Sequence, residues 1–400
     1  MWPIDARVFR EFVKKLDPHP DLPCGHFLVH YAARHRPPAD DMAVSGVEDV
    51  ALIDAYAAAL EAAYATFTAA GWPEPAPDPA SGRVHVYVLH MPEVGIPDAP
   101  FTFPYGQGFH LVALRSENYE LTREAMIRRA EVEAVHEVAH LFTTAFARRH
   151  TQLPWVPAPW YWFDEATALF AEHLVFAGHA ETLRYALHWV RRPELPLTDN
   201  HGYLSGWFVR YLAARFGPDL LREVWERVGP CSTPLAALTD ELTARGTTFR
   251  EVFAGGYCVD AGFVRPVCAR VYERYGRRTL AGRHQVGPGG KAVATGTVLP
   301  LGCDYHTVAA SGVGAVTVRA EVSEGDFDSL AVVAAVETGG GIERSSLTRR
   351  AGEPGLIGTL DLGGESPAEI LVSITVVPTP AGAGPGRPPA AVRYHIVVTA

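Results

Sequence analysis

One segment of the chain carries residues whose types and spacing suit metal-assisted hydrolysis. In Val135-His-Glu-Val-Ala-His140-Leu-Phe142, two histidines are four residues apart and a glutamate follows the first. Positions i and i+4 of a helix lie on one face, so both imidazoles can bind one Zn²⁺ per chain. Glu137 can then take a proton from the metal-bound water and pass it to a leaving amine. A chain of this composition contains such a motif by chance about 0.05 times.

A catalytic zinc site needs a third protein ligand and an open position. The next expected helix begins near Tyr161, after an aromatic cluster, and Glu165 lies early on it. Glu165 is therefore the predicted third ligand. Glu172 follows two turns later on the same face, where it either holds an imidazole N–H or is a solvated helix glutamate.

These two segments together resemble the gluzincins, a family of thermolysin-like zinc metallopeptidases. In that family, H-E-x-x-H is followed by a helix that often carries W-x-x-E-[GA]-x-A, and Trp162-Phe-Asp-Glu165-Ala-Thr-Ala168 matches it. The resemblance covers residues from about 84 to 217. It implies a zincin-type catalytic domain whose cleft has the strand 109–114 as its upper edge. Two features depart from the family: its G-x-M-E-N strand motif is absent, and Leu169 replaces a second-sphere carboxylate.

Tyr203-Leu-Ser-Gly206 resembles the Y-x-x-G of the aminopeptidase branch, whose tyrosine hydrogen-bonds the oxyanion of the tetrahedral intermediate. A phenol is neutral at working pH and can donate such a bond. The resemblance assigns this role to Tyr203, although a tyrosine packed at a helix start fits the sequence equally well. His201 is the reserve donor.

The leading functional prediction is zinc-dependent hydrolysis of a peptide bond, with a peptide or protein substrate and an endopeptidase action. We expect the substrate to add as a strand along Phe109, His110, Leu111 and Val112. An aminopeptidase of the same fold is the first alternative, and Glu117 or Glu120 could hold its substrate's amine. The second alternative is an inactive, peptidase-like binding protein that acts through a C-terminal domain. An inactive protein of this kind would be expected to have lost its catalytic base or a metal ligand, whereas Glu137 is present here.

The spacing of apolar residues predicts the helices and strands that must position these residues. Short apolar runs rich in β-branched residues predict strands over 26–31, 83–89 and 109–114. Helical spacing predicts an Ala-rich helix over 50–70, a metal-binding helix from Thr122, and helices over 161–177 and 203–216. Shorter helices are expected over 220–227 and 264–275.

Composition changes along the chain divide it into three parts. Residues 1–118 are predicted to form an N-terminal α/β subdomain with the edge strand, and residues 119–285 a helical zinc-binding subdomain. Gly287-Pro-Gly-Gly290 is interpreted as a linker. Beyond it, residues 293–400 alternate in the manner of strands, which predicts a β-sandwich. The expected fold class is therefore α+β.

The overall composition excludes other classes of function. The 400-residue chain has 48% apolar residues and a net charge of −10. Its only lysines are Lys14, Lys15 and Lys291, so we expect no nucleic-acid partner. A soluble protein is expected, since no unbroken apolar stretch is long enough for a transmembrane segment and the N-terminus lacks a secretory signal. Secretion is suggested only by the family resemblance, and Cys258 and Cys268 are candidates for a disulfide. Compartment, oligomeric state and latency are left open.

Overall fold

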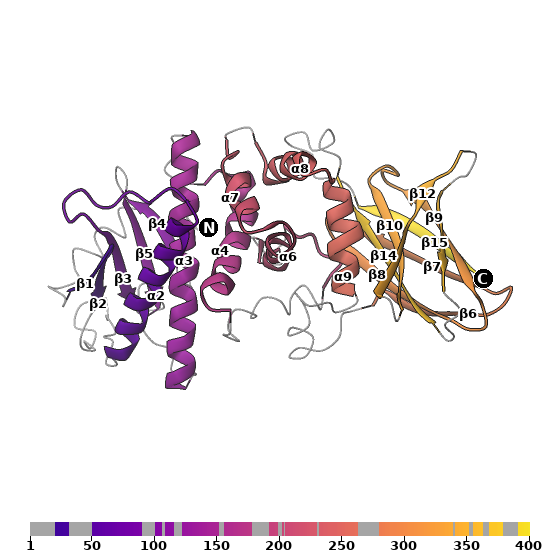
Figure 1. The fold of residues 1–400 in the computed structure, drawn as a ribbon, viewed down its shortest axis with the longest axis horizontal. Coiled ribbons are helices and arrows are strands. Elements are labelled where there is room, and N and C mark those ends of the chain that lie inside the picture. Colours follow the sequence, from indigo (N-terminus) through magenta and orange to yellow (C-terminus); the bar gives the residue numbers. More distant parts are fainter. Residues whose placement is uncertain are drawn as a thin grey trace, which may run out of the picture. The chain divides into compact units, whose positions relative to one another are not determined.

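The computed structural model (Figure 1) describes residues 21–31, 50–89, 101–105, 109–115, 122–151, 156–177, 192–198, 202–203, 205–229, 232–262, 280–338, 341–351, 355–362, 368–378 and 391–400. Within these residues, helices and three sheets are present, which agrees with the predicted α+β class. The chain divides into two compact units. Unit 1 comprises Met1–Arg184 and Leu221–Thr233, and unit 2 comprises Tyr185–Leu220 and Pro234–Ala400.

Unit 1 contains a five-stranded sheet with the strand order β1-β2-β3-β5-β4. Its strands are β1 (Asp21–Cys24), β2 (Phe27–Tyr31), β3 (Val84–Leu89), β4 (Phe101–Tyr105) and β5 (Phe109–Arg115). The three inner strands, β2, β3 and β5, are parallel, whereas β1 and β4 pair antiparallel at the two edges. The inner strands are the three that the sequence predicts.

The prediction that Phe109–Val112 form the substrate-binding edge is wrong. These residues lie in β5, which pairs with β3 on one side and with β4 on the other. Among the described strands β4 is at the edge, within a stretch that its prolines and glycines predict to be a loop. Pro104 pairs with His110 in the ladder. A proline cannot donate to a further strand, and sheets tolerate it at an edge for that reason.

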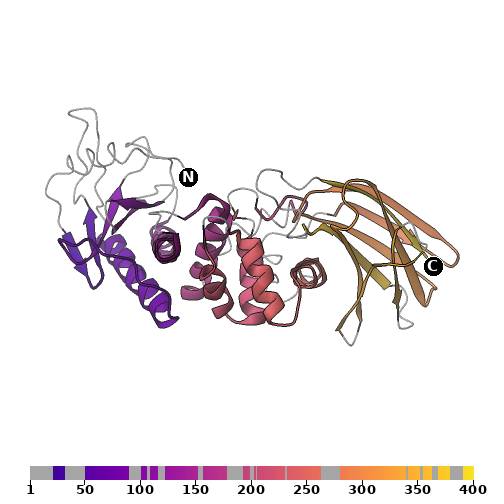
Figure 2. The ribbon, with the colours of Figure 1, turned by 90° about the horizontal axis from the view of Figure 1, so that it is seen from above.

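Two long helices pack on the sheet of unit 1 (Figure 2). Helix α2 (Val50–Ala69) contacts β1 and β2, and α3 (Arg123–Thr151) contacts β4 and β5 as well as α2. The hydroxyl oxygen of Thr122 accepts a hydrogen bond from the Ala125 N–H at 3.3 Å, so Thr122 caps α3 as predicted. Helix α2 is long and apolar enough to cross a membrane, judged by length and composition alone. Core helices of soluble proteins are often just as long and apolar. In α2, 50% of the most apolar 18-residue stretch is buried.

The second helix of the predicted site is α4 (Tyr161–Val175), preceded by the 3₁₀ turn η2 (Ala158–Trp160). Aromatic side chains anchor it: Trp160 and Phe163 pack against Trp225 of α7 (Asp219–Trp225), with ring centroids 5.1 and 5.7 Å from the Trp225 ring. The Trp225 indole N–H donates to the Thr167 hydroxyl at 3.1 Å. Trp160 and Phe163, in the aromatic cluster that precedes Glu165, are thus core residues that pack α4 against α7.

The helical part of unit 2 consists of α6 (Gly206–Phe216), α8 (Pro234–Ala244), the π-helical segment η5 (Glu251–Cys258) and α9 (Val259–Gly262). Helix α6 begins three residues later than predicted, because Ser205 and Gly202 form a turn before it. Cys258 is a free thiol, and Cys268, its predicted disulfide partner, lies outside the described residues. The helix predicted over 264–275 also lies outside them.

The C-terminal part of unit 2 is a β-sandwich of two five-stranded sheets. One has the order β11-β10-β14-β8-β6 and the other β12-β13-β9-β15-β7. The strands of the first sheet are β6 (Gly282–Val286), β8 (Cys303–Ala310), β10 (Leu330–Thr338), β11 (Gly341–Ser346) and β14 (Ala368–Val376). Those of the second are β7 (Lys291–Val298), β9 (Ala315–Glu324), β12 (Thr348–Arg349), β13 (Leu356–Asp361) and β15 (Val392–Thr399). Valine, leucine and isoleucine from both sheets share one buried core.

Gly287–Gly290 is a turn inside the sandwich and not a linker before it. The turn joins β6 to β7, and the Gly290 N–H donates to the Gly287 carbonyl at 2.8 Å. Gly289 has a φ of +64°, which glycine adopts without strain. The sequence signal for a flexible boundary and that for a tight turn are both glycine and proline, so composition alone does not separate them.

Candidate metal centre

The candidate metal centre lies on α3, where His136, Glu137 and His140 come together. Each offers one ligand atom, and these atoms all lie within 4.8 Å of one another. Among the residues that the structure describes, this is the one group of at least three His, Cys, Asp or Glu side chains that could hold a metal ion. His136 is 6% exposed and Glu137 3%. The helical spacing of the motif therefore gathers these side chains at one buried point.

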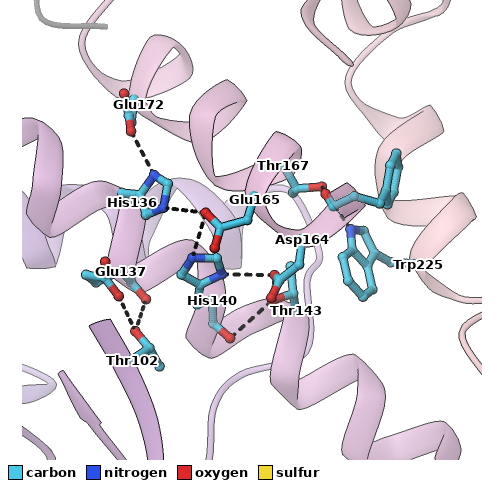
Figure 3. Close-up of polar contacts among 11 residues, drawn as sticks. Thr102, His136, Glu137, His140, Thr143, Asp164, Glu165, Thr167, Glu172 and Trp225 are labelled. Carbon is cyan, nitrogen blue, oxygen red and sulfur yellow. Dashed lines mark hydrogen bonds and ion pairs between the residues drawn. The ribbon is translucent and has the colours of Figure 1, made fainter. Parts of the chain in front are cut away.

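Glu165 reaches the same point from α4. Its Oε2 lies 3.2 Å from Nε2 of His136 and 3.8 Å from Nε2 of His140 (Figure 3). Two ligand atoms of a tetrahedral zinc ion, each at about 2.0–2.1 Å from the metal, are about 3.3 Å apart. The three atoms thus surround a position that a single ion of this size can occupy. The Glu165 side chain is 22% exposed, so the group is partly open on the side of Glu165.

The outer nitrogen of His136 is held by Glu172, which is fully buried on α4. Glu172 Oε1 lies 2.8 Å from Nδ1 of His136. The contact predicted for Glu172 with an imidazole is therefore present, and the solvated alternative is wrong. A carboxylate that accepts the Nδ1–H leaves the lone pair of Nε2 pointing at the metal position.

The outer nitrogen of His140 faces Asp164, a residue that the sequence analysis missed. Asp164 Oδ1 lies 3.0 Å from Nδ1 of His140 and accepts a hydrogen bond from the Thr143 hydroxyl at 2.6 Å. The Thr143 hydroxyl also lies 3.1 Å from the His140 carbonyl oxygen. One signal could have found Asp164: each metal-binding imidazole needs an acceptor for its second nitrogen, so two acceptors had to be sought.

The protonation of the two imidazoles depends on the surrounding carboxylates. Burial by itself lowers the pKa of His136, but hydrogen bonds to Glu165 and Glu172 outweigh burial and raise that pKa well above its ordinary value. Burial also lowers the pKa of His140, but Asp164 and Glu165 raise it to about 9. In the metal-free protein the carboxylates therefore hold protons on the imidazoles. A divalent cation would supply the same positive charge and release these protons, so the site fits a metal ion.

Glu137 is positioned by the edge strand β4. The Thr102 hydroxyl lies 2.8 Å from Oε2 of Glu137 and 2.9 Å from its carbonyl oxygen. Burial raises the pKa of Glu137, while the two histidines and the Thr102 hydrogen bond lower it in part. Sequence analysis missed Thr102, because nothing marks a threonine in a proline-rich stretch as the partner of a residue 35 positions later.

Four other candidate residues stay predictions. Tyr203 belongs to unit 2 and the metal centre to unit 1, so its role as oxyanion donor stays a prediction. His201, Glu117 and Glu120 lie outside the described residues.

Comparison with known proteins does not assign a family. No family model matches the chain, and no curated protein matches it. Among solved structures, the chain is similar to the pre-peptidase C-terminal domain of collagenase from Bacillus anthracis, with a TM-score of 0.21 and 10% identity over 31% of this chain and 99% of that one. It is also similar to PliG of Aeromonas hydrophila, a periplasmic inhibitor of g-type lysozyme, with a TM-score of 0.19 and 15% identity over 30% and 98% of the two chains. Similarity at these scores says nothing about activity.

Proposed function

We propose that the chain is a zinc-dependent peptide-bond hydrolase of the gluzincin type, with a zincin-type catalytic domain in unit 1. The observation that carries the proposal is the convergence of His136 Nε2, His140 Nε2 and Glu165 Oε2 on one partly open position beside Glu137. Two imidazoles and one carboxylate, with a fourth position open, form the donor set of a catalytic zinc site.

Zinc bound at this position would polarise the scissile carbonyl and make a water molecule more acidic. Glu137 takes a proton from the attacking water and later gives it to the leaving amine. Burial suits Glu137 to both steps, because a raised pKa brings the carboxylate closer to the pH at which it must accept and donate. Thr102 holds one carboxylate oxygen in place throughout.

The proposed substrate is an extended peptide that pairs with β4. Within the described residues β4 pairs only with β5, so its outer edge has no strand beside it. A peptide added there would form backbone hydrogen bonds irrespective of its side chains, except at Pro104, which has no N–H to donate. The bond between Thr102 and Glu137 ties this edge to the catalytic base, which would place the scissile carbonyl near the metal. Tyr203 is the proposed donor to the oxyanion.

The substitution Glu137→Gln tests the proposal. Glutamine keeps the size of the side chain but accepts no proton, so turnover of a peptide library should fall by at least about 10²-fold. The content of tightly bound zinc should stay near one equivalent, because Glu137 is the proposed base and not a proposed ligand. Glu131→Gln, on the same helix but only partly buried, is the matched control and should leave both values unchanged.

Three outcomes would contradict parts of this proposal. Full activity in Glu137→Gln would remove Glu137 from the mechanism. Equal loss of zinc and activity would make it a structural residue. Zinc binding without cleavage of any peptide by the wild-type chain would favour the inactive binding protein instead. Peptides with acetylated N-termini distinguish the remaining alternative, because an aminopeptidase does not cleave them.

A further inference from the structure

A second group of polar side chains lies inside the β-sandwich of unit 2, where the proposed hydrolysis makes no use of it. The group consists of His284 on β6, Asp304 and His306 on β8, and Tyr394 on β15. His306 is 2% exposed, Tyr394 0% and Asp304 8%, whereas His284 is only partly buried. Burying such groups is costly unless they are hydrogen-bonded, so their arrangement is specific.

The hydrogen bonds of the group run in one direction. The Tyr394 hydroxyl donates to Oδ2 of Asp304 at 2.8 Å. That bond uses the only proton of the phenol, so the Tyr394 oxygen accepts from Nε2–H of His306, also at 2.8 Å. A neutral imidazole with its proton on Nε2 has a lone pair on Nδ1. This nitrogen faces Nε2 of His284 at 3.2 Å.

A glycine lies directly beside these two nitrogens. Gly282 pairs with His306 in the parallel ladder of β6 and β8. A methyl group on Gly282 would lie 2.6 Å from Nε2 of His284 and 2.8 Å from Nδ1 of His306. A side chain at position 282 would therefore press against both nitrogens, and glycine avoids this contact.

We propose that His284 and His306 bind a divalent transition-metal ion through these two facing nitrogens. The nitrogen separation of 3.2 Å is close to the value of about 3.3 Å for two ligands of a tetrahedral ion. Imidazole pairs suit Zn²⁺, Ni²⁺ and Cu²⁺ and not Ca²⁺ or Mg²⁺. Without an ion, Nε2–H of His284 donates to His306; binding moves that proton to Nδ1 of His284.

Tyr394 and Asp304 give this site the outer support that metal-binding histidines require. The second nitrogen of His306 donates to the phenol, and the phenol donates to the carboxylate, which fixes the ring and its tautomer. The partly exposed His284 gives the ion access, and water completes its coordination. With two protein ligands, the ion should exchange more readily than one held by His136, His140 and Glu165.

The site can be tested by calorimetric titration of the full metal-free chain with Zn²⁺. The wild type should bind two equivalents, the second more weakly. Gly282→Ala places a methyl group against both nitrogens, and His284→Asn removes a ligand from the partly exposed end of the group. Each should bind one equivalent, with at least a 10-fold loss for the second. His395→Asn, which removes a partly exposed histidine from β15, is the control and should bind two.

A single equivalent in the wild type, or a second one that persists in both Gly282→Ala and His284→Asn, would overturn the proposal. Thermal unfolding of each variant checks that the sandwich is intact. His140→Ala should lose the tight equivalent and keep the weak one, so a failure of this site and a failure of the proposed catalytic centre give different titrations. Cu²⁺ as a second probe should give an electron paramagnetic resonance spectrum with nitrogen hyperfine coupling that disappears in His284→Asn.

Discussion

Replacing Asp164 by asparagine should weaken metal binding without disturbing the fold. Asp164 is 4% exposed, and its Oδ1 lies 3.0 Å from the outer nitrogen of His140. The amide is nearly isosteric, and its oxygen can still accept the Thr143 hydroxyl. The variant therefore removes the negative charge opposite His140 and little else.

The expected loss in zinc affinity is about 10–100-fold, since outer carboxylates orient metal-binding histidines and increase their basicity. This factor corresponds to about 1.4–2.7 kcal/mol of binding free energy. Because Asp164 raises the pKa of His140, the variant should also lower that pKa below about 9 in the metal-free protein. The imidazole would then lose its proton at lower pH, which NMR titration of the ring can follow.

Competition with a chromophoric chelator measures the zinc affinity of the wild type and the variant. Asp54→Asn, an exposed substitution on α2, controls for the change in net charge. Glu172→Gln should weaken binding by a similar factor, and the double variant should combine both losses because each carboxylate serves a different imidazole. A zinc dissociation constant within twofold of the wild type for Asp164→Asn would refute the orienting role.

Three further predictions concern single side chains: Thr102, Tyr203 and Cys24. Thr102→Val removes a hydrogen bond that lowers the pKa of Glu137, so the acidic limb of the kcat/KM profile should move to higher pH, with zinc content unchanged; an unmoved limb would contradict this. Tyr203→Phe should reduce kcat by about 10²–10³-fold with little change in KM, as for loss of an oxyanion donor; a change confined to KM would refute it. Burial, and to a smaller extent the negative charge of Glu61, raise the pKa of the Cys24 thiol to about 11. Alkylation of Cys24, measured by peptide mass spectrometry, should therefore be about 100-fold slower at pH 8 than in the unfolded chain, and it should become faster as the pH rises. Equal rates in the folded and unfolded chains would contradict this.

Much of the candidate metal centre is local in sequence, and for that reason it could be predicted. The separation of His136 and His140 by one helical turn brings both to one face of any helix that contains them. Glu165 and Glu172 are likewise two turns apart on one helix. A sandwich over 293–400 could be predicted too, because alternation along a strand requires no knowledge of its neighbours. Strand β6 lies before that range and was not predicted.

The order of strands in a sheet is not local, and only the tertiary structure decided it. β4 and β5 are joined by a short connection and pair antiparallel, which places β5 inside the sheet and gives β4 the edge. The apolar pattern of residues 109–114 is compatible with either position. A strand's periodicity reports which faces are buried and not which side of it has a partner.

Contacts between elements likewise depended on the fold. Thr102 reaches Glu137 from a strand, and Asp164 reaches His140 from a neighbouring helix. In the sandwich, Gly282 and His306 are neighbours because β6 pairs parallel with β8. The sequence by itself determined which side chains could bind a metal and which helical face carried them. The packing of α3 against α4, and of strands against one another, decided which carboxylates and hydroxyls complete each site, because these contacts join residues that no local pattern relates.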